Sequence, residues 1–353
     1  MAAELALGLI LAAAALALAT AWRARAREAA ERRGHPPEGE FVTVEGVRIH
    51  VVVRGQGGPG VRDLVLIHGA SGAARDYTFA LAGQLAGPYR LFIPDRPGFG
   101  WSAPAPGREA LADQAALVAG AVAALGAEAP VVLGHSYGGA VALAWGLAGG
   151  PAALVLLSAP SHPWKGGMPL FYRITSTWWG QRLAVPLVSA WVRKATLRDA
   201  VAEVFAPDAV PEGYARHFGP MLSATVGVLR LNARQRKALK AELKAMVALY
   251  PGLSLPVESL HGTADEIVWT SVHARPLAAA VPGARLVELE GVGHMPHHAR
   301  PGAVIAAIDR AADRAAARAV AVPADSTGGQ GGGQAGGRAT GAIGPAAGDA
   351  RLR

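Results

Sequence analysis

The order of apolar segments constrains the fold of this chain more than any other feature. Between residues 41 and 160, short β-branched runs alternate with longer stretches rich in Ala and Leu. Four runs are continuously apolar and of strand length: DLVLIH, YRLFIP, APVVLG and AALVLLS. Such strands are buried on both faces, as in a parallel sheet covered by helices. FVTV and RIHVVV predict an opening antiparallel hairpin around Glu45-Gly46. The alternation predicts a doubly wound, mostly parallel α/β sheet.

The alternation stops near residue 160 and resumes with VESLHG at residue 257. The segment between contains no strand-like run and has a mostly helical pattern, so we interpret it as an insertion into one domain. A helix near 270–280, the run RLVELEG and a closing helix from about 301 to 319 complete the pattern. The predicted organisation is an N-terminal anchor with a basic flank (1–34), a core in two parts (41–159 and 251–320), a helical cap (160–250) and a disordered tail (321–353).

The N-terminus carries an uncharged stretch from Leu5 to Trp22. As a helix it would be about 27 Å long, close to the roughly 30 Å of a bilayer core. The only preceding charged side chain is Glu4, and five arginines follow the stretch. This asymmetry favours an uncleaved single span in the inner membrane, with the remaining chain in the cytoplasm. The alternatives are secretion after cleavage of a signal peptide, near Ala19-Thr20-Ala21, and a soluble Ala-rich helix. We expect a chain without residues 1–34 to be soluble and active.

Composition excludes several chemistries. The chain contains no cysteine, so disulfides, thiol nucleophiles and cysteine-ligated metals are excluded. Residues 161–250 hold thirteen Lys/Arg and five Asp/Glu, which accounts for the formal net charge of +8. Without a nucleic-acid-binding motif, this charge does not predict a nucleic-acid partner. Basic residues spaced three or four apart in this segment predict a solvated helix face, or a face directed at anionic lipid: Arg230, Arg234, Lys237, Lys240 and Lys244.

Polar residues follow several of the predicted strands. In VVLGHSYGGA, Ser136 lies between a strand and a helix, and neighbouring glycines allow a tight turn there. Gly-x-Ser-x-Gly alone is a weak signal in so glycine-rich a chain. Asp265 and His294, however, follow two later strands, and chemistry in parallel sheets collects beyond the carboxyl ends of strands. A serine hydroxyl needs a base, and an imidazole needs an acid to orient it. The three residues therefore predict a nucleophilic site.

With these motifs in order, residues 41 to about 319 resemble the α/β-hydrolases. The resemblance rests on VLIHGASG, DRPGFGWS, GHSYGG, and HGTADEIV with GVGHMPHH. It implies Ser136 as nucleophile, His294 as base and Asp265 as orienting acid. It also implies that the backbone N–H groups of Ala70 and Tyr137 form an oxyanion hole, and that no cofactor or metal is needed. The 160–250 insertion corresponds to the family's cap, which sets specificity.

Several residues near these motifs have competing interpretations. Glu266 is a rival to Asp265 as the acid. We do not expect His297 and His298 to bind a metal, because GVGHMPHHARPG contains no carboxylate or cysteine. His135 and His68 are interpreted as packing residues, and Asp95 and Arg96 as braces of the oxyanion loop. Some of the many large apolar side chains of the cap are expected to line an apolar pocket: Trp164, Phe171, Tyr172, Trp178, Trp179, Trp191, Phe205 and Phe218.

The expected activity is hydrolysis of a small apolar carboxylic ester through an acyl-enzyme. C–C bond, lactone or amide hydrolysis and perhydrolysis use the same three residues and stay open as alternatives. A protein of this fold that binds a hydrophobic ligand or a partner without catalysis is the rival from a different class.

Overall fold

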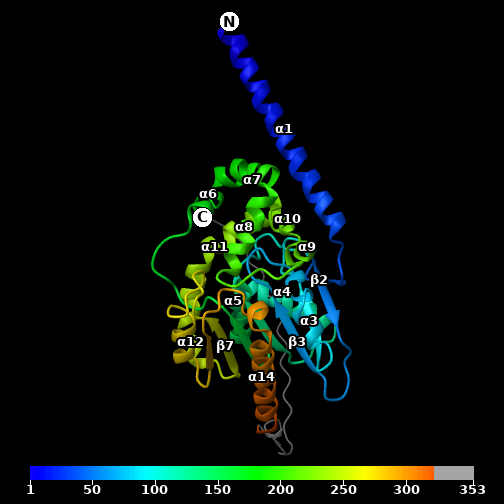
Figure 1. The fold of residues 1–353 in the computed structure, drawn as a ribbon, viewed down its shortest axis with the longest axis vertical. Helices are drawn as coiled ribbons and strands as arrows, with labels where there is room; N and C mark the ends of the chain where they lie inside the picture. Colours follow the sequence, from blue (N-terminus) through cyan, green and yellow to red (C-terminus); the bar gives the residue numbers. More distant parts are fainter. Residues whose placement is uncertain (322–353) are drawn as a thin grey trace, which may run out of the picture.

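A computed structural model describes residues 1–321 of the chain. Its centre is an eight-stranded sheet in the order β1-β2-β4-β3-β5-β6-β7-β8 (Figure 1). The strands are β1 (Glu40–Val44), β2 (Val47–Arg54), β3 (Arg62–Ile67), β4 (Tyr89–Pro94), β5 (Val131–His135), β6 (Ala153–Leu157), β7 (Val257–Gly262) and β8 (Arg285–Leu289). β2 pairs with β1 and with β4 in antiparallel fashion, and the other five pairs of neighbouring strands are parallel. The predicted mostly parallel sheet is therefore confirmed.

The opening hairpin turns at Glu45 and Gly46, whose φ angles are 48° and 79°. Two consecutive positive φ angles are typical of the tight turns that match the twist of paired strands. Beyond the hairpin, strands β3 to β6 are buried almost throughout, as expected for continuous apolar runs in a covered sheet. Their carboxyl ends lie on one edge of the sheet.

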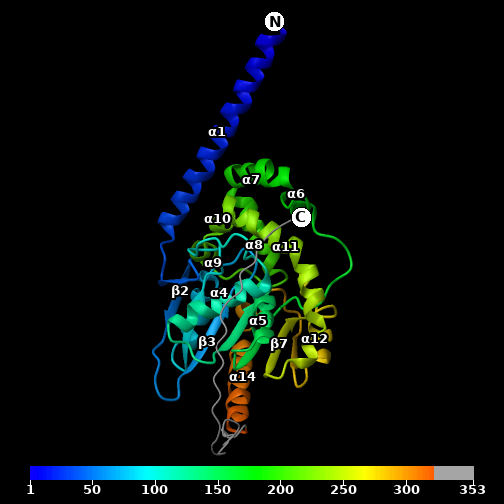
Figure 2. The same ribbon diagram turned by 180° about the vertical axis from the view of Figure 1, so that it is seen from behind.

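Helices cover both faces of the sheet (Figures 1 and 2). α4 (Leu111–Ala124), α5 (Tyr137–Ala148) and α12 (Ala274–Ala280) contribute to one apolar cluster, and α3 (Leu81–Leu85) and α14 (Pro301–Ala321) to the other. The buried carboxylate of Glu258 in β7 binds two arginines of α14, Arg310 and Arg314, each at 3.0 Å. This cluster ties the closing helix to the sheet. The predicted tail, from residue 322 onward, lies outside the described residues.

The segment predicted as a cap is helical and contains no strand among the described residues 160–250. It comprises α6 (Leu170–Thr175), η1 (Gly180–Ala184), α7 (Val185–Trp191), α8 (Lys194–Phe205), α9 (Tyr214–Phe218), α10 (Pro220–Ser223), α11 (Val226–Val247) and η2 (Tyr250–Gly252). Its aromatic residues divide into two groups. Phe205 and Phe218 are buried in a small core with Tyr214, whereas Trp178 and Trp191 are exposed on its outer side. The cap aromatics thus do not all point inward.

The first helix, α1 (Ala2–Gly34), is continuous, and its N-terminal half projects from the body (Figures 1 and 2). Residues 1–19 are exposed, and contact with the body begins at Thr20. α1 is the one helix of the described chain long and apolar enough to span a membrane, although a signal sequence would also meet that criterion.

The C-terminal half of α1 packs against the cap. Arg23 Nε donates to the carbonyl oxygen of Ala190 at 2.9 Å, and Arg27 donates to those of Ala190 and Val192 at 2.6 and 2.7 Å. These carbonyls lie at the end of α7, where backbone acceptors lack partners within the helix. Removal of residues 1–34 would therefore leave the end of α7 without these donors. No pattern in the sequence predicted this contact.

Candidate active site

Ser136 lies at the turn between β5 and α5 with a positive φ of 50° and a ψ of −125°. Such backbone geometry is costly for a residue with a side chain and is typical of a nucleophile held on a sharp strand-to-helix turn. Close packing explains the glycines around it. A Cβ atom at Gly134 would lie 2.3 Å from the carbonyl oxygen of Gly138, and one at Gly139 would lie 2.4 Å from Ala159 Cβ. No larger residue fits at either position without displacing its neighbours.

The structure brings the three predicted site residues into hydrogen-bond contact. His294 Nε2 lies 2.9 Å from Ser136 Oγ, and His294 Nδ1 lies 2.8 Å from Asp265 Oδ2. All three residues are buried. An imidazole between a hydroxyl and a carboxylate can accept the serine proton at Nε2 while its Nδ1–H is held by the acid.

The carboxylate of Asp265 is fixed on both oxygens. Its Oδ1 accepts the backbone N–H groups of Ile267 and Val268, both at 2.9 Å. Burial disfavours its charge, but hydrogen bonds from His261 and His294 outweigh that cost and hold the pKa of this carboxyl below its usual value. The rival Glu266 is exposed and makes no contact with His294. Asp265 is therefore the carboxylate that faces the histidine.

His135 supports the loop that carries His294. Its Nε2 lies 2.8 Å from the carbonyl oxygen of His294, and the two rings are 5.0 Å apart. Burial lowers the pKa of His135 well below its usual value, so the ring is neutral at pH 7 and its Nε2–H donates to that carbonyl. The side chain therefore reaches the loop that carries His294, a structural role that agrees with its interpretation as a packing residue.

The loop after β3 passes directly beside the serine turn. A Cβ atom at Gly69 would lie 3.1 Å from Ser136 Cβ, so the backbone at Gly69, the residue before Ala70, lies close to the serine. Tyr137 is the first residue of α5, where the backbone N–H has no acceptor within the helix. Two such N–H groups beside a nucleophile can stabilise an oxyanion.

Arg96 holds the loop after β3 in place through hydrogen bonds to its backbone. Its guanidinium donates to the carbonyl oxygens of His68 at 3.0 Å and Gly69 at 2.9 Å. Burial lowers its pKa to about 10, so it remains charged at pH 7. Asp95 accepts the backbone N–H of Ala74 at 2.7 Å on the far side of the loop. Both residues act as the predicted braces.

Two further residues that position the loop come from outside it and were missed in the sequence. Asn232 of α11 accepts the backbone N–H of Ser71 at 3.2 Å and donates to its hydroxyl at 2.7 Å. Ser223 of the cap donates to the carbonyl oxygen of Ser71. Ser71 has a φ of 56°, so the cap holds a strained point of the loop. Asn232 and Ser223 lie more than 150 residues after Ser71 in the chain, and no sequence pattern predicts a contact over that separation.

A buried cluster lies next to the His294 loop. Asp76 of α2 (Arg75–Thr78) accepts hydrogen bonds from His297 at 3.1 Å, His298 at 2.9 Å and the hydroxyl of Tyr214 at 2.8 Å. Burial disfavours its charge, but the two histidines hold the pKa of Asp76 well below its usual value. The two histidines lie in α13 (Pro296–Ala299), a short helix that precedes the closing one.

The Asp76 cluster corrects one step of the sequence argument. A carboxylate does reach His297 and His298, from a residue more than 200 positions earlier in the chain. One ligand atom from each of the three residues lies within 4.8 Å of the others, a spacing that could hold a cation. The imidazole N–H groups satisfy the carboxylate and link α2 to α13, while the buried Nδ1 of His297 has no hydrogen-bond partner among the described residues.

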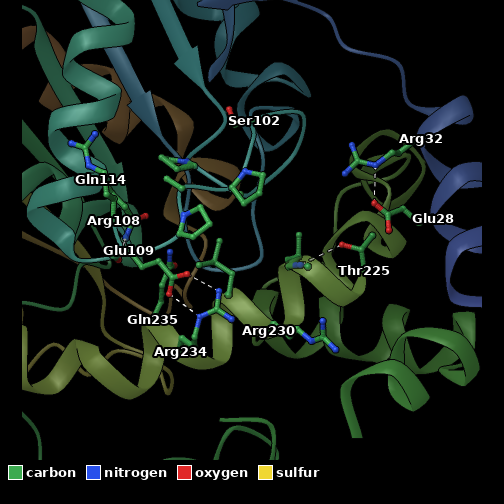
Figure 3. A pocket seen from close by; sticks show the side chains of 18 residues that line it. Glu28, Arg32, Ser102, Arg108, Glu109, Gln114, Thr225, Arg230, Arg234 and Gln235 are labelled. Atoms are coloured by element: carbon green, nitrogen blue, oxygen red, sulfur yellow. Dashed lines mark hydrogen bonds and ion pairs between the residues drawn. The ribbon is translucent and has the colours of Figure 1, made fainter. Parts of the chain in front are cut away.

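A cavity of about 320 Å³ opens beside α11, between the base of α1 and the loop after β4 (Figure 3). Six of its eighteen lining residues are charged, and the ion pair of Arg234 with Glu109 crosses one side. Gln114 and Gln235 line it and also bind the guanidinium of Arg96. Ser136 and His294 are not among the residues that line this cavity. It is therefore not the space in which the three site residues meet.

The fold and the arrangement at the sheet edge define an α/β-type hydrolase with a helical cap. The chain belongs to the alpha/beta hydrolase family, whose model matches residues 64–308. An uncharacterised protein of Mycobacterium tuberculosis is 28% identical over 298 residues, which cover 78% of this chain and 81% of that protein. The dihydrolipoyllysine-residue acetyltransferase component of the acetoin cleaving system of Cupriavidus necator is 37% identical over 103 residues, or 29% of this chain. The match spans only 26% of that longer protein.

Solved structures share the fold. A thermophilic esterase from Thermogutta terrifontis has a TM-score of 0.61 at 22% identity, with 78% of this chain and 99% of the esterase covered. A bacterial membrane phospholipase A has a TM-score of 0.61 at 21% identity, with 88% of this chain and 98% of that chain covered. At these identities the likeness concerns the fold.

Proposed function

We propose that this protein is a membrane-anchored serine hydrolase that cleaves a small apolar carboxylic ester through an acyl-enzyme. The observation that carries the proposal is the pair of hydrogen bonds that link Ser136, His294 and Asp265, at 2.9 and 2.8 Å. Esterases among the proteins of similar fold support ester chemistry.

In this mechanism, His294 Nε2 takes the proton of Ser136 as the hydroxyl oxygen attacks the ester carbonyl carbon. The resulting oxyanion is bound by the backbone N–H groups of Ala70 and Tyr137, and one such donor typically contributes on the order of 10²–10³ in rate. The imidazolium then returns the proton to the alkoxide that leaves as an alcohol. Water, deprotonated by the same imidazole, attacks the acyl-serine and releases the carboxylic acid. Asp265 remains ionised throughout and holds the imidazole.

A fluorophosphonate probe tests the proposal, because it modifies a serine only when that serine is activated. We expect labelling of the wild-type protein at Ser136 and none of Ser136→Ala, with equal melting temperatures for the two. A folded wild-type protein that is not labelled would favour the non-catalytic ligand-binding alternative. An ester panel of graded acyl length would then define the substrate, and turnover confined to lactones, amides or C–C bonds would favour one of the alternative reactions.

We further propose that α1 anchors the chain as a single span in the inner membrane, with the hydrolase domain on the cytoplasmic side. The uncharged stretch that ends at Trp22, followed by five arginines, supports this orientation. The contact of Thr20 with the cap supports an uncleaved helix, since cleavage after Ala21 would remove it. The mass of the protein purified from membranes tests retention of the helix, and protease protection tests the orientation.

A further inference from the structure

Large apolar side chains are exposed together on one part of the cap. Of the twelve large hydrophobic side chains that are exposed in the described chain beyond α1, seven lie within residues 170–191. These seven are Leu170, Phe171, Trp178, Trp179, Leu183, Leu187 and Trp191. We call this surface the α6–α7 face. Trp178 is 73% exposed and Leu183 is 63% exposed, so most of the surface of these side chains is not covered by the described residues. Contiguous exposed apolar patches of this kind mark interaction surfaces.

The position of α1 identifies what covers this face. α1 packs against α7, and its contact with the body begins where Trp191 Nε1 donates to Thr20 Oγ1 at 3.2 Å. The uncharged stretch of α1 ends two residues later, at Trp22. If α1 spans a bilayer, the end of that stretch marks the boundary between acyl chains and headgroups. α7 therefore lies at that boundary, next to the point where the helix leaves the body (Figures 1 and 2).

The composition of the face fits a lipid interface. Tryptophans with exposed rings concentrate at the level of the headgroups, where the ring meets acyl chains and the indole N–H meets water. Residues 165–198 contain six basic residues and no acidic one. The guanidinium of Arg182 lies 4.4 Å from the ring of Trp178, and that of Arg23 lies 4.6 Å from the ring of Trp191. Positive charge beside inserted aromatic rings favours anionic headgroups.

We propose that the α6–α7 face is inserted into the headgroup region of the bilayer that α1 spans, so that the cap is in contact with lipid. This inference rests on the anchor proposed above and is independent of the reaction that the site catalyses. It differs from the lipid-facing alternative of the sequence analysis, because the inserted face is the aromatic segment before α8 and not the basic stripe of α11.

Fluorescent labels at single positions test the proposal directly, because the natural chain contains no cysteine. The full-length Leu183→Cys variant carries an environment-sensitive fluorophore in the α6–α7 face. The Ala316→Cys variant carries it on an exposed position of α14, at the opposite end of the molecule (Figure 1). Both are reconstituted into vesicles of neutral and anionic phospholipid that contain a spin-labelled lipid quencher, and iodide serves as the aqueous quencher.

We expect the label at position 183 to emit at shorter wavelength, to lose at least half its intensity to the lipid quencher, and to be shielded from iodide. The label at position 316 should show the reverse. A protein that floats with the vesicles while position 183 stays open to iodide would overturn cap insertion and leave the anchor in place. Shielding from both quenchers would indicate a second protein copy on the face and would equally overturn it. Protein that does not float with vesicles would overturn both the anchor and the insertion.

Discussion

Replacement of Gly138 by alanine tests how closely the serine turn must approach the oxyanion loop. A Cβ atom at this position would lie 2.3 Å from the carbonyl oxygen of Ile67 and 2.5 Å from that of His68. Both contacts are to backbone, which cannot rotate away as a side chain can. An ordinary contact between this Cβ atom and the carbonyl oxygen of Ile67 is 3.4 Å or longer, so the serine turn and the loop would have to move apart by about 1 Å.

A separation of this size moves the N–H of Ala70 relative to Ser136 but leaves all three proposed catalytic side chains present. Misplacement by about 1 Å can cost on the order of 10² in rate. We therefore expect kcat of Gly138→Ala to fall about 100-fold, which corresponds to about 2.7 kcal/mol of transition-state stabilisation.

The assay is steady-state hydrolysis of a chromogenic short-chain ester, with the rate of fluorophosphonate labelling as a second readout and the melting temperature as a folding check. The matched control is Gly227→Ala in α11, where a Cβ atom would meet nothing within 4 Å. We expect the control to keep wild-type kcat. A Gly138→Ala variant with kcat within threefold of wild type would refute the argument that this contact sets the geometry of the site.

Three further predictions test individual charges. Asp265→Asn should lower kcat about 10⁴-fold through loss of imidazole orientation, while Glu266→Gln should keep wild-type kcat; the reverse result would assign the acid role to Glu266. Glu258→Gln should lower the free energy of unfolding in urea by about 2 kcal/mol, because two partly exposed arginines lose the buried carboxylate that they share; an unchanged urea midpoint would contradict this. Asp76 has a folded-state pKa well below the unfolded value near 3.8, so its carboxylate stabilises the fold above that pH and the contribution is lost as the pH falls further. The urea midpoint should therefore drop more steeply below pH 4 in the wild-type protein than in Asp76→Asn, and parallel pH profiles would show that this carboxylate is not a source of stability.

The sheet was predictable from sequence because its strands are short apolar runs buried on both faces. Each predicted run overlaps its observed strand, from the hairpin to β8, and the ends of run and strand agree within two residues. Ser136, Asp265 and His294 were predictable for a related reason: each follows a strand whose carboxyl end lies on the same sheet edge. Their positions after the strands predicted the site, because the strands themselves could be identified from the sequence.

Contacts between distant segments were not predictable. The carboxylate that binds His297 and His298 comes from Asp76, and neither motif indicates the other. Periodicity in the cap likewise does not separate buried Phe205 from exposed Trp178, because that distinction depends on how short helices pack on one another. The arginines after the apolar stretch were interpreted from charge alone, although Arg27 also binds the end of α7.

The hydrogen bonds between α1 and the end of α7 have a mechanical consequence. Ser136 is buried, so the access of a substrate depends on the position of the segments around it, and a cap that moves changes that access. α7 cannot move far unless α1 moves with it or the bonds from Arg23 and Arg27 break. In a chain anchored through α1, opening of the cap is thereby coupled to the tilt of the anchoring helix. Bilayer thickness, which sets the tilt of a spanning helix, then acts on access to the serine.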